Sequence, residues 1–266
     1  MAEGKKKESK LKPQVYKDPR PAEYFTQYHQ SVRKSIGKMY EVVRVILSAP
    51  TILIYRVRQI GVENVPSHGA AIVTPNHFSQ MDHFFAAVWL RRKVAFMAKS
   101  QLFSNPVFRF IFKHGGVFPV RRGYHDEEAF ITAETVLNRG DCVLMYAEGG
   151  RSRSGELGEP KRGVGKLTLE SGVPVVPCAI HGSASVRSWK RLRFPKVTVQ
   201  FGEPMTFPQV DDPTPEQQQE VANKVFDEVR KLYVALEENG RKGVLKALRE
   251  AVPDGVEAPR AKSHSA

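Results

Sequence analysis

His77 and Asp82 form the first pair of residues in this sequence whose chemistry and spacing suggest a function. Both lie in the segment 74–83, between an apolar stretch expected to be a buried strand (residues 69–73) and an apolar run expected to start a helix (84–90). At such a corner a carboxylate can contact one imidazole nitrogen, which fixes the tautomer and leaves the other nitrogen as a base. The pair would then suit removal of a proton from an alcohol. A structural histidine beside an N-capping aspartate is the simpler alternative, which the pair alone leaves open.

A glycine- and arginine-rich segment, residues 147–155, follows another expected strand over residues 141–146. Its glycines would let backbone N–H groups approach a ligand closely. Arg151 offers a planar guanidinium that matches a phosphate, and Glu148 would either orient Arg151 or accept a substrate hydroxyl. The glycine spacing is not that of a Walker loop. Taken alone, the segment is equally compatible with a basic surface turn.

A third group, Arg121 and Arg122, ends a strand expected within residues 114–123. A pair of charges at the end of a strand is usually only solvated. However, ligand sites in α/β sheets gather at the carboxyl ends of strands, so the three segments are expected to form one site. A base beside cations that can bind phosphate suggests acyl transfer to a hydroxyl on a phosphate-bearing acceptor.

The composition fits a globular protein with a basic N-terminal region. The 266 residues carry a formal charge of +13, and residues 1–60 contain 13 Lys and Arg against 5 Asp and Glu. This excess indicates an anionic surface as partner, either nucleic acid or a membrane. No helix-turn-helix, RNA-recognition or zinc pattern is present in the sequence, which disfavours nucleic acid. Cys142 and Cys178 lie in apolar runs and are expected to be small core residues rather than a disulfide or metal ligands.

The chain divides into four expected parts. Residues 1–21 form a basic leader expected to be disordered, residues 22–58 a pair of amphipathic helices, residues 59–250 the main domain, and residues 251–266 a disordered tail. In the main domain strands alternate with helices, which predicts an α/β fold with a mixed, largely parallel sheet flanked by helices.

The helix expected from Ala22 has apolar residues on one side and cations on the other, as interfacial membrane helices do. Pro50 is expected to break or bend it, leaving a second short segment to about Arg58. The apolar run from Val45 to Tyr55 is too short to span a bilayer, which needs about 20 residues. The sequence thus predicts a protein that lies on a membrane without crossing it. Packing of the same helix on the main domain is the alternative. After it, residues 62–66 are expected to form a short strand and turn.

Four segments resemble, in order, the four motifs of the glycerolipid acyltransferase family, whose best-known members are the 1-acyl-sn-glycerol-3-phosphate acyltransferases. They are Asn76-His-Phe-Ser-Gln-Met-Asp82, Gly116-Val-Phe-Pro-Val-Arg-Arg122, Glu148-Gly-Gly-Arg-Ser-Arg-Ser-Gly155 and Val173-Pro-Val-Val-Pro177. The resemblance covers roughly residues 60–205. One departure is that the third motif usually starts Phe-Pro-Glu-Gly-Thr-Arg, and here residues 146–151 are Tyr-Ala-Glu-Gly-Gly-Arg.

The resemblance implies a glycerol-3-phosphate acyltransferase-like fold with an N-terminal helix pair at the membrane. It also implies that His77 acts as general base and that Asp82 orients it. The donor would be acyl-CoA or acyl-carrier protein, with no cofactor and no metal. The acceptor's phosphate and glycerol would be bound by Arg121, Glu148, Gly149 and Arg151.

These implications give an expected activity. The protein would transfer an acyl chain to the free hydroxyl of a lysophospholipid. The main expected acceptor is 1-acyl-sn-glycerol 3-phosphate (lysophosphatidic acid), which would give phosphatidic acid. Glycerol 3-phosphate, a glycolipid or another lysophospholipid are alternative acceptors. A non-catalytic peripheral protein that binds anionic lipid is the alternative from another class. The expected location is the cytoplasmic face of the cell membrane, as a peripheral protein.

Overall fold

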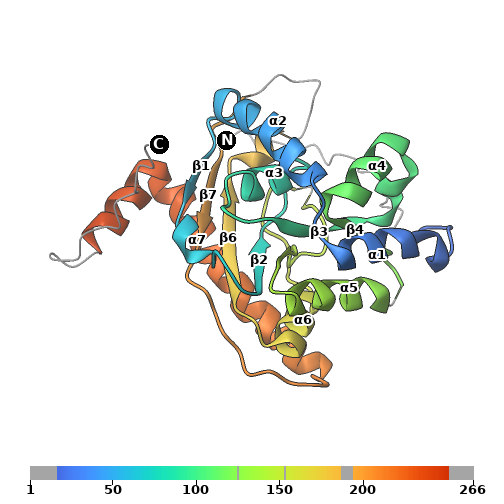
Figure 1. The fold of residues 1–266 in the computed structure, drawn as a ribbon. Helices are drawn as coiled ribbons and strands as arrows, with labels where there is room; N and C mark the ends of the chain where they lie inside the picture. Colours follow the sequence, from blue (N-terminus) through green and yellow to red (C-terminus); the bar gives the residue numbers. More distant parts are fainter. Residues whose placement is uncertain (1–16, 125, 153, 187–193, 252–266) are drawn as a thin grey trace, which may run out of the picture.

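A computed structural model describes residues 17–124, 126–152, 154–186 and 194–251 (Figure 1). The leader and the tail expected at the two ends of the chain therefore lie almost entirely outside the described residues.

The described residues fold around one seven-stranded sheet with the strand order β1-β7-β6-β2-β5-β3-β4. All neighbouring strands are parallel except β6 and β7, so the sheet is mixed and largely parallel, as predicted. The strands are β1 (Arg58–Ile60), β2 (Ala71–Pro75), β3 (Val94–Lys99), β4 (Val117–Val120), β5 (Cys142–Leu144), β6 (Val175–His181) and β7 (Thr198–Phe201).

Helices flank the sheet. Helix α7 packs against β6 and α6, and α5 packs against α6 and the β3–β5 region. In Figure 1, α2, α3 and α4 lie together at the top of the view, and α5 and α6 lie at the bottom. The helices are α1 (Thr26–Lys34), α2 (Met39–Leu53), α3 (Asp82–Ala87), α4 (Pro106–Gly115), α5 (Glu127–Asn138), α6 (Gly163–Ser171) and α7 (Pro215–Glu250).

The central strands are buried on both faces. Every residue of β2 and β5 is buried, and so are all residues of β6 except His181. Strands covered on both sides read as continuous apolar runs, which is why their sequences lack the alternation of a half-exposed strand. Cys142 and Cys178 lie in this core as free, buried thiols, as expected from their apolar surroundings.

The N-terminal helices differ from the prediction in where the chain breaks. The interruption falls between α1 and α2, where Ser35 is extended, and α2 runs through Pro50 to Leu53. The sequence predicted that Pro50 breaks or bends the helix, and the break is not observed, since α2 continues through Pro50. Proline removes one helical N–H, but here it stands one turn from the helix end. The helix resumes directly, because the Ile54 N–H donates to the Pro50 carbonyl (2.9 Å).

The short strand predicted for residues 62–66 was also wrong. Residues Val62–Asn64 form a 3₁₀ turn, and the edge strand lies just before them in β1. Gly61 separates the two with a left-handed backbone (φ 72°). A β-carbon at Gly61 would come within 2.3 Å of the Phe201 carbonyl oxygen, so this turn requires glycine.

The parallel strands bring the predicted motifs to one edge of the sheet. Strands β2 and β5 are direct neighbours, with Val73 opposite Leu144. The two segments that follow them, which carry His77 and Glu148, consequently leave the sheet side by side. This arrangement follows from parallel pairing, since parallel neighbours end at the same edge.

Candidate active site

The corner that carries His77 is fixed to the sheet by the preceding residue, Asn76. The buried Asn76 side chain continues the pairing with β6 beyond the end of β2: its Oδ1 accepts a hydrogen bond from the Ile180 N–H (2.7 Å), and its Nδ2 donates to the Ile180 carbonyl (3.2 Å). The amide thus replaces a backbone partner where the chain leaves the sheet. It sets the point from which the His77 side chain projects.

One carboxylate oxygen holds this corner closed. Oδ2 of Asp82 accepts hydrogen bonds from Nδ1 of His77 (2.9 Å) and from the backbone N–H groups of Phe78 (2.7 Å) and Ser79 (2.7 Å). Asp82 is the first residue of α3 and is completely buried. Hydrogen bonds to an ionised acceptor are short and strong. The Asp82 carboxylate therefore fixes the imidazole with its proton on Nδ1.

His77 is placed to act as a base through its other nitrogen. The side chain is buried, and this burial lowers the pKa of His77 although the hydrogen bond to Asp82 acts in the opposite direction. The ring is therefore neutral near neutral pH. With Nδ1 bonded to the carboxylate, Nε2 is the unprotonated nitrogen that can accept a proton.

Glu148, which follows β5, is hydrogen-bonded to the same corner. Its Oε1 accepts the backbone N–H of His77 (2.8 Å), and its Oε2 accepts the N–H of Gly158 (2.9 Å). Burial raises the pKa of Glu148 to about 7, against the effect of these two hydrogen bonds. The carboxylate thus ties the glycine-rich segment to the histidine backbone. Both of these hydrogen bonds join Glu148 to backbone groups.

The segment after Glu148 folds over His77. Gly149 has a left-handed backbone (φ 63°), and its N–H donates to the Tyr146 carbonyl (3.0 Å). Three residues later, the Ser152 N–H donates to the His77 carbonyl (2.8 Å). Gly149 therefore serves as a turn residue that brings the Arg151 region back to the corner.

Two cations lie close enough to affect the histidine. The charges of Arg151 and Arg122 both lower the pKa of His77. Arg122 approaches the glycine-rich segment closely, because a β-carbon on Gly150 would lie 2.9 Å from its Nη1. These two arginines make the surroundings of the base positive.

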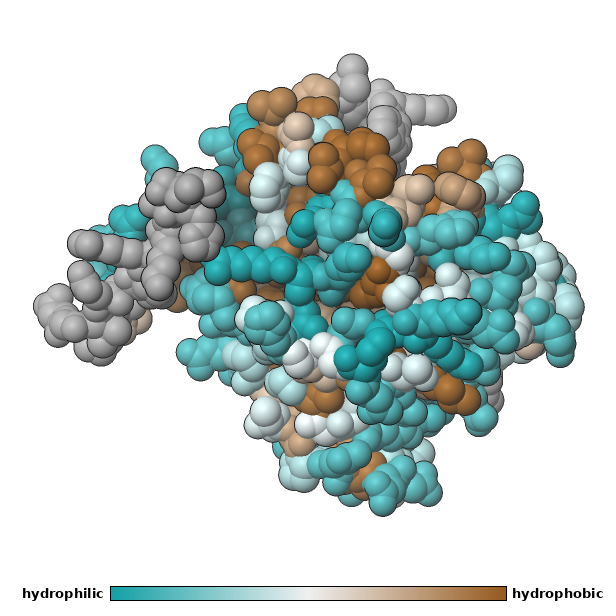
Figure 2. Space-filling view, in the orientation of Figure 1, coloured by the Kyte–Doolittle hydropathy of each residue, from teal (hydrophilic) through white to brown (hydrophobic). Residues whose placement is uncertain are grey.

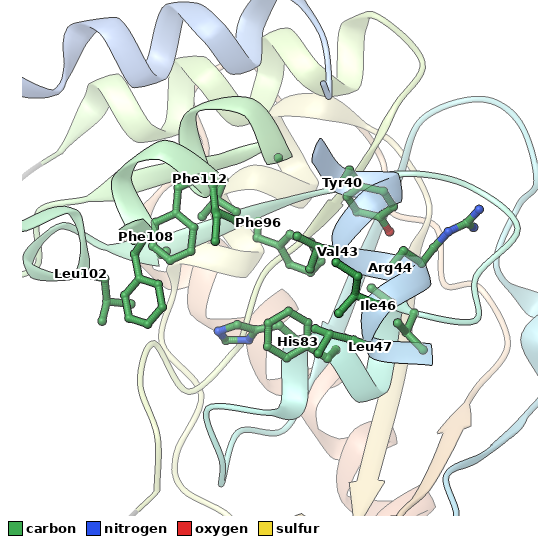
Figure 3. A pocket seen from close by; sticks show the side chains of 17 residues that line it. Tyr40, Val43, Arg44, Ile46, Leu47, His83, Phe96, Leu102, Phe108 and Phe112 are labelled. Atoms are coloured by element: carbon green, nitrogen blue, oxygen red, sulfur yellow. The ribbon is translucent and has the colours of Figure 1, made fainter. Parts of the chain in front are cut away.

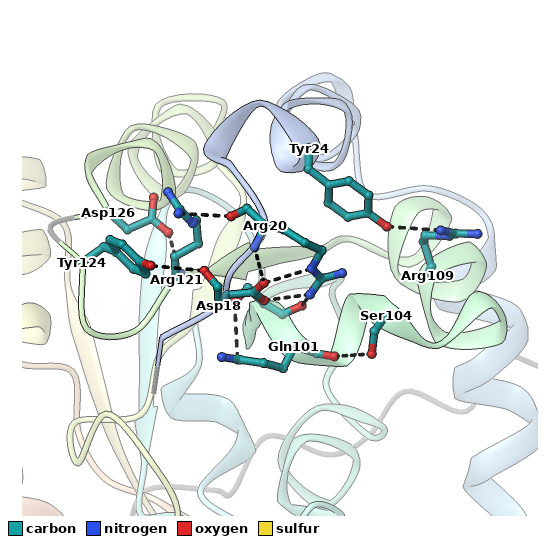
Figure 4. A network of polar contacts seen from close by, with 10 residues as sticks. Asp18, Arg20, Tyr24, Gln101, Ser104, Arg109, Arg121, Tyr124 and Asp126 are labelled. Carbon is teal, nitrogen blue, oxygen red and sulfur yellow. Dashed lines mark hydrogen bonds and ion pairs between the residues drawn. The ribbon is translucent and has the colours of Figure 1, made fainter. Parts of the chain in front are cut away.

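Arg121, in contrast, belongs to a polar network with Arg20, Tyr124 and Asp126 (Figure 4). Its Nη2 donates to the Arg20 carbonyl (3.2 Å), and its guanidinium lies over the Tyr124 ring at 4.2 Å. Its backbone N–H is bound by Asp126 (2.6 Å). Arg121 therefore holds the segment before α1. Its neighbour in sequence, Arg122, lies against Gly150 of the glycine-rich segment instead.

Two residues of the site were missed in the sequence. The Tyr146 ring stacks on the His77 ring at a centroid distance of 3.8 Å and an angle of 17°. Its hydroxyl is 2.5 Å from Nδ1 of His83, which directly follows Asp82. A signal existed in each case: Tyr146 ends the β5 segment just before Glu148, and His83 stands beside the predicted orienting residue.

An apolar cavity of about 350 Å³ lies beside the His83 ring (Figure 3). It lies between α2, α4 and β3, and His83 forms part of its wall. The sequence did not reveal this cavity, since it forms where α2 packs against the segment from α3 to β4, about 40 residues later in the chain. The main apolar lining residues are Val43, Leu47, Phe84, Phe96, Phe108 and Phe112.

The structure thus assembles most of the predicted site. His77, Asp82, Glu148, Gly149 and Arg151 come together around one corner, and Arg121 does not join them. The site combines a buried neutral base, positive charge and a nearby apolar cavity. Such a site can deprotonate a hydroxyl on an anionic molecule that carries an apolar chain or reacts with one.

Comparisons with known proteins identify similarity to acyltransferases. Residues 56–181 match the family model described as Acyltransferase. The chloroplastic 1-acyl-sn-glycerol-3-phosphate acyltransferase of Arabidopsis thaliana is 28% identical over 135 residues, 50% of this chain and 38% of the relative. A probable 1-acyl-sn-glycerol-3-phosphate acyltransferase of Mycoplasma pneumoniae is 28% identical over 214 residues, 74% of this chain and 77% of the relative.

The comparison with solved structures identifies a similar fold. The crystal structure of the 1-acyl-sn-glycerophosphate acyltransferase from Thermotoga maritima matches with a TM-score of 0.53 at 22% identity, covering 79% of this chain and 88% of that chain. The chain spans less than half the length of the first two relatives, both chloroplastic, at 38% and 46%. These matches confirm the resemblance to glycerolipid acyltransferases that the four motifs indicated. The matching family model and the relatives are named as acyltransferases, which is the expected enzyme class.

The two hydrogen bonds of Glu148 predict a measurable cost when one oxygen is replaced. In Glu148→Gln, the amide nitrogen cannot accept, so either the His77 or the Gly158 N–H loses its partner. We expect the free energy of unfolding to fall by about 1–3 kcal/mol. Burial raises the pKa of Glu148 from 4.5 to about 7 in the folded state. The protonated carboxyl therefore stabilises folded wild type at low pH, and this stabilisation is lost as the pH rises from about 4.5 to about 7. The deficit of the variant should therefore shrink with rising pH.

Urea unfolding of both proteins at several pH values measures these effects. Glu159→Gln is the matched control, because Glu159 is exposed in the same segment. Equal stability of the Glu148 and Glu159 variants at all pH values would contradict the bracing role.

Proposed function

We propose that this chain, whose residues 56–181 match the acyltransferase family, transfers an acyl chain from a thioester donor to the free hydroxyl of a lysophospholipid. The donor is acyl-CoA or acyl-carrier protein. The favoured acceptor is 1-acyl-sn-glycerol 3-phosphate, and the product is then phosphatidic acid. The observation that carries this proposal is the hydrogen bond between Nδ1 of His77 and Oδ2 of Asp82, at a corner that adjoins both positive charge and an apolar cavity.

In the proposed reaction, Nε2 of His77 accepts the proton of the acceptor hydroxyl as its oxygen attacks the thioester carbonyl carbon. Asp82 stabilises the imidazolium that forms, since its carboxylate remains hydrogen-bonded to Nδ1. When the tetrahedral intermediate collapses, the carbon–sulfur bond breaks and His77 returns the proton to the leaving thiolate. The products are the ester and the free thiol, and no acyl-enzyme is required.

The positive surroundings favour a phosphate-bearing acceptor. Arg122 and Arg151 both act on the His77 imidazole through their charge. A guanidinium can pair two of its N–H groups with phosphate oxygens. Several relatives are named for 1-acyl-sn-glycerol-3-phosphate, and a Pseudomonas fluorescens relative, 29% identical over 119 residues, is named glycerol-3-phosphate acyltransferase. Glycerol 3-phosphate is therefore the alternative acceptor to test.

The apolar cavity suits the acyl chain. Its lining is made almost entirely of aliphatic and aromatic side chains, and it reaches His83 beside the stacked pair of His77 and Tyr146. A chain that fills this cavity would leave its carbonyl end next to the base. Burial of each methylene contributes about 0.8 kcal/mol. This contribution would hold the donor in place while the hydroxyl attacks.

The proposed reaction has a direct assay: release of free thiol from palmitoyl-CoA and oleoyl-CoA. We expect thiol release to require an acceptor and to be fastest with lysophosphatidic acid, compared with glycerol 3-phosphate, lysophosphatidylcholine and monoacylglycerol. His77→Ala should lower the rate by a factor of at least ~10², because general-base assistance contributes about 10²–10⁴.

His68→Ala is the matched control, since His68 is exposed in the loop before β2 and should retain full activity. Unchanged turnover in His77→Ala would exclude the mechanism. Binding of anionic vesicles with no thioester turnover by the wild type would instead favour a lipid-binding protein without activity.

We propose a peripheral position on the cytoplasmic face of a membrane, and exposed apolar side chains support the contact with lipid. Helix α2 exposes Val45 (68%), Ile46 (64%) and Leu53 (77%), and α4 exposes Val107 (63%) and Phe110 (57%). Figure 2 shows brown, apolar surface at the top of this view, over α2, and at its upper right, over α4. Among the described residues, no helix has both the length and the apolar character that crossing a bilayer demands. Apolar side chains exposed on two helices of one face suit contact with lipid.

Charged substitutions on α2 test this position. The double variant Val45→Glu, Leu53→Glu should sediment less with vesicles of phosphatidylcholine and phosphatidylglycerol than wild type, because two carboxylates oppose both burial in lipid and the anionic surface. Val234→Glu on α7 is the control, as Val234 is also exposed (37%) but lies on a different helix. Equal sedimentation of the double variant and wild type would rule out α2 as the membrane contact.

A further inference from the structure

His83 occupies the space between the proposed base and the proposed acyl cavity. It is the second residue of α3, directly after Asp82, and its ring lies 5.4 Å from the His77 ring, centroid to centroid. The same side chain forms part of the cavity wall, where Figure 3 shows it among the apolar residues. His83 therefore contacts the region in which a thioester carbonyl would meet the attacking hydroxyl.

Tyr146 determines which nitrogen of His83 carries the proton. The Tyr146 hydroxyl and Nδ1 of His83 are 2.5 Å apart. Burial raises the pKa of the tyrosine and lowers that of His83 to about 3, so both groups are uncharged near neutral pH. Among the described residues, Nδ1 of His83 is the hydrogen-bond partner of this buried hydroxyl, so we assign the hydroxyl as the donor and Nδ1 as the acceptor. The proton of the neutral imidazole consequently resides on Nε2.

The two histidines are therefore in opposite tautomers. Asp82 accepts from His77 and leaves its Nε2 as an acceptor, and Tyr146 donates to His83 and leaves its Nε2–H as a donor. An acyl transfer needs one group of each kind: an acceptor for the proton of the attacking hydroxyl and a donor for the negative charge that develops on the carbonyl oxygen.

The separation of the rings fits these two roles. Each nitrogen must lie about 3 Å from its own oxygen. In the tetrahedral intermediate, both oxygens are bonded to the same carbon. The two imidazoles must then be separated by no more than one tetrahedral centre and two hydrogen bonds, and the 5.4 Å between the ring centroids is within that range.

We infer that His83 is a further catalytic residue, whose Nε2–H donates a hydrogen bond to the thioester carbonyl oxygen as it becomes an oxyanion. This inference rests on the proposed acyl transfer. Tyr146 is a positioning residue in it: its hydroxyl sets the tautomer of His83, and its ring packs against His77. His83 adds no covalent step; it stabilises charge that His77 and the hydroxyl create.

Three variants test the role of His83 in thiol release from palmitoyl-CoA. His83→Phe keeps a ring in the cavity wall but removes the donor, and kcat should fall by about 10²–10³. The KM for palmitoyl-CoA should change little, because the lost bond forms mainly in the transition state. His83→Gln retains an N–H donor at a similar reach and should recover much of the loss. Tyr146→Phe preserves the stacking but releases the tautomer, so we expect a smaller decrease than in His83→Phe.

A second measurement does not depend on turnover. Palmitoyl-CoA labelled with ¹³C at the carbonyl is bound to His77→Ala, and its carbonyl stretch is recorded by infrared difference spectroscopy. We expect the carbonyl stretch to lie at lower frequency in this complex than in a dry apolar solvent. The double variant His77→Ala, His83→Phe should lose this shift.

The outcomes separate this inference from the proposed function. Absence of thiol release by wild type would overturn the proposed function itself. An active wild type and inactive His77→Ala, combined with normal kcat in His83→Phe, would leave that function standing and overturn the role of His83. A fall in kcat that His83→Gln does not relieve, with an unchanged carbonyl frequency, would show that His83 has only a structural role.

Discussion

The site depends on one buried carboxylate oxygen, Oδ2 of Asp82, which accepts three N–H groups. Two of them belong to the backbone of Phe78 and Ser79, and the third is Nδ1–H of His77. The same oxygen therefore shapes the turn between β2 and α3 and sets the tautomer of the histidine that the turn presents. A side chain that only oriented the imidazole could be lost without loss of the turn; here the two functions share one atom.

Burial gives the site its second property. His77, Asp82 and Glu148 are all buried, and so is Tyr146, which stacks on His77. Removal from water lowers the pKa of His77, so this base remains unprotonated near neutral pH. The same burial raises the pKa of Glu148. Low solvent exposure also strengthens the hydrogen bonds that Asp82 and Glu148 accept at this corner.

The sequence predicted those parts of the structure that depend on local pattern. The apolar runs located the core strands, and the motif spacing placed His77 and Asp82 at a strand-to-helix corner, as observed. It did not distinguish Arg121 from Arg122, because both follow the end of β4 and only packing decides which of them binds the segment before α1. The His83–Tyr146 contact and the apolar cavity also escaped prediction, since each joins elements that are distant in the chain.

The central claim is that Asp82 holds His77 as a neutral ring with its proton on Nδ1. Long-range ¹H–¹⁵N NMR of the histidine side chains tests it most directly, with the His77 signals identified by their absence from His77→Gln. The account predicts, near neutral pH, a protonated Nδ1 and an Nε2 with the chemical shift of an unprotonated nitrogen. A proton on Nε2, or a charged imidazolium at that pH, would contradict it.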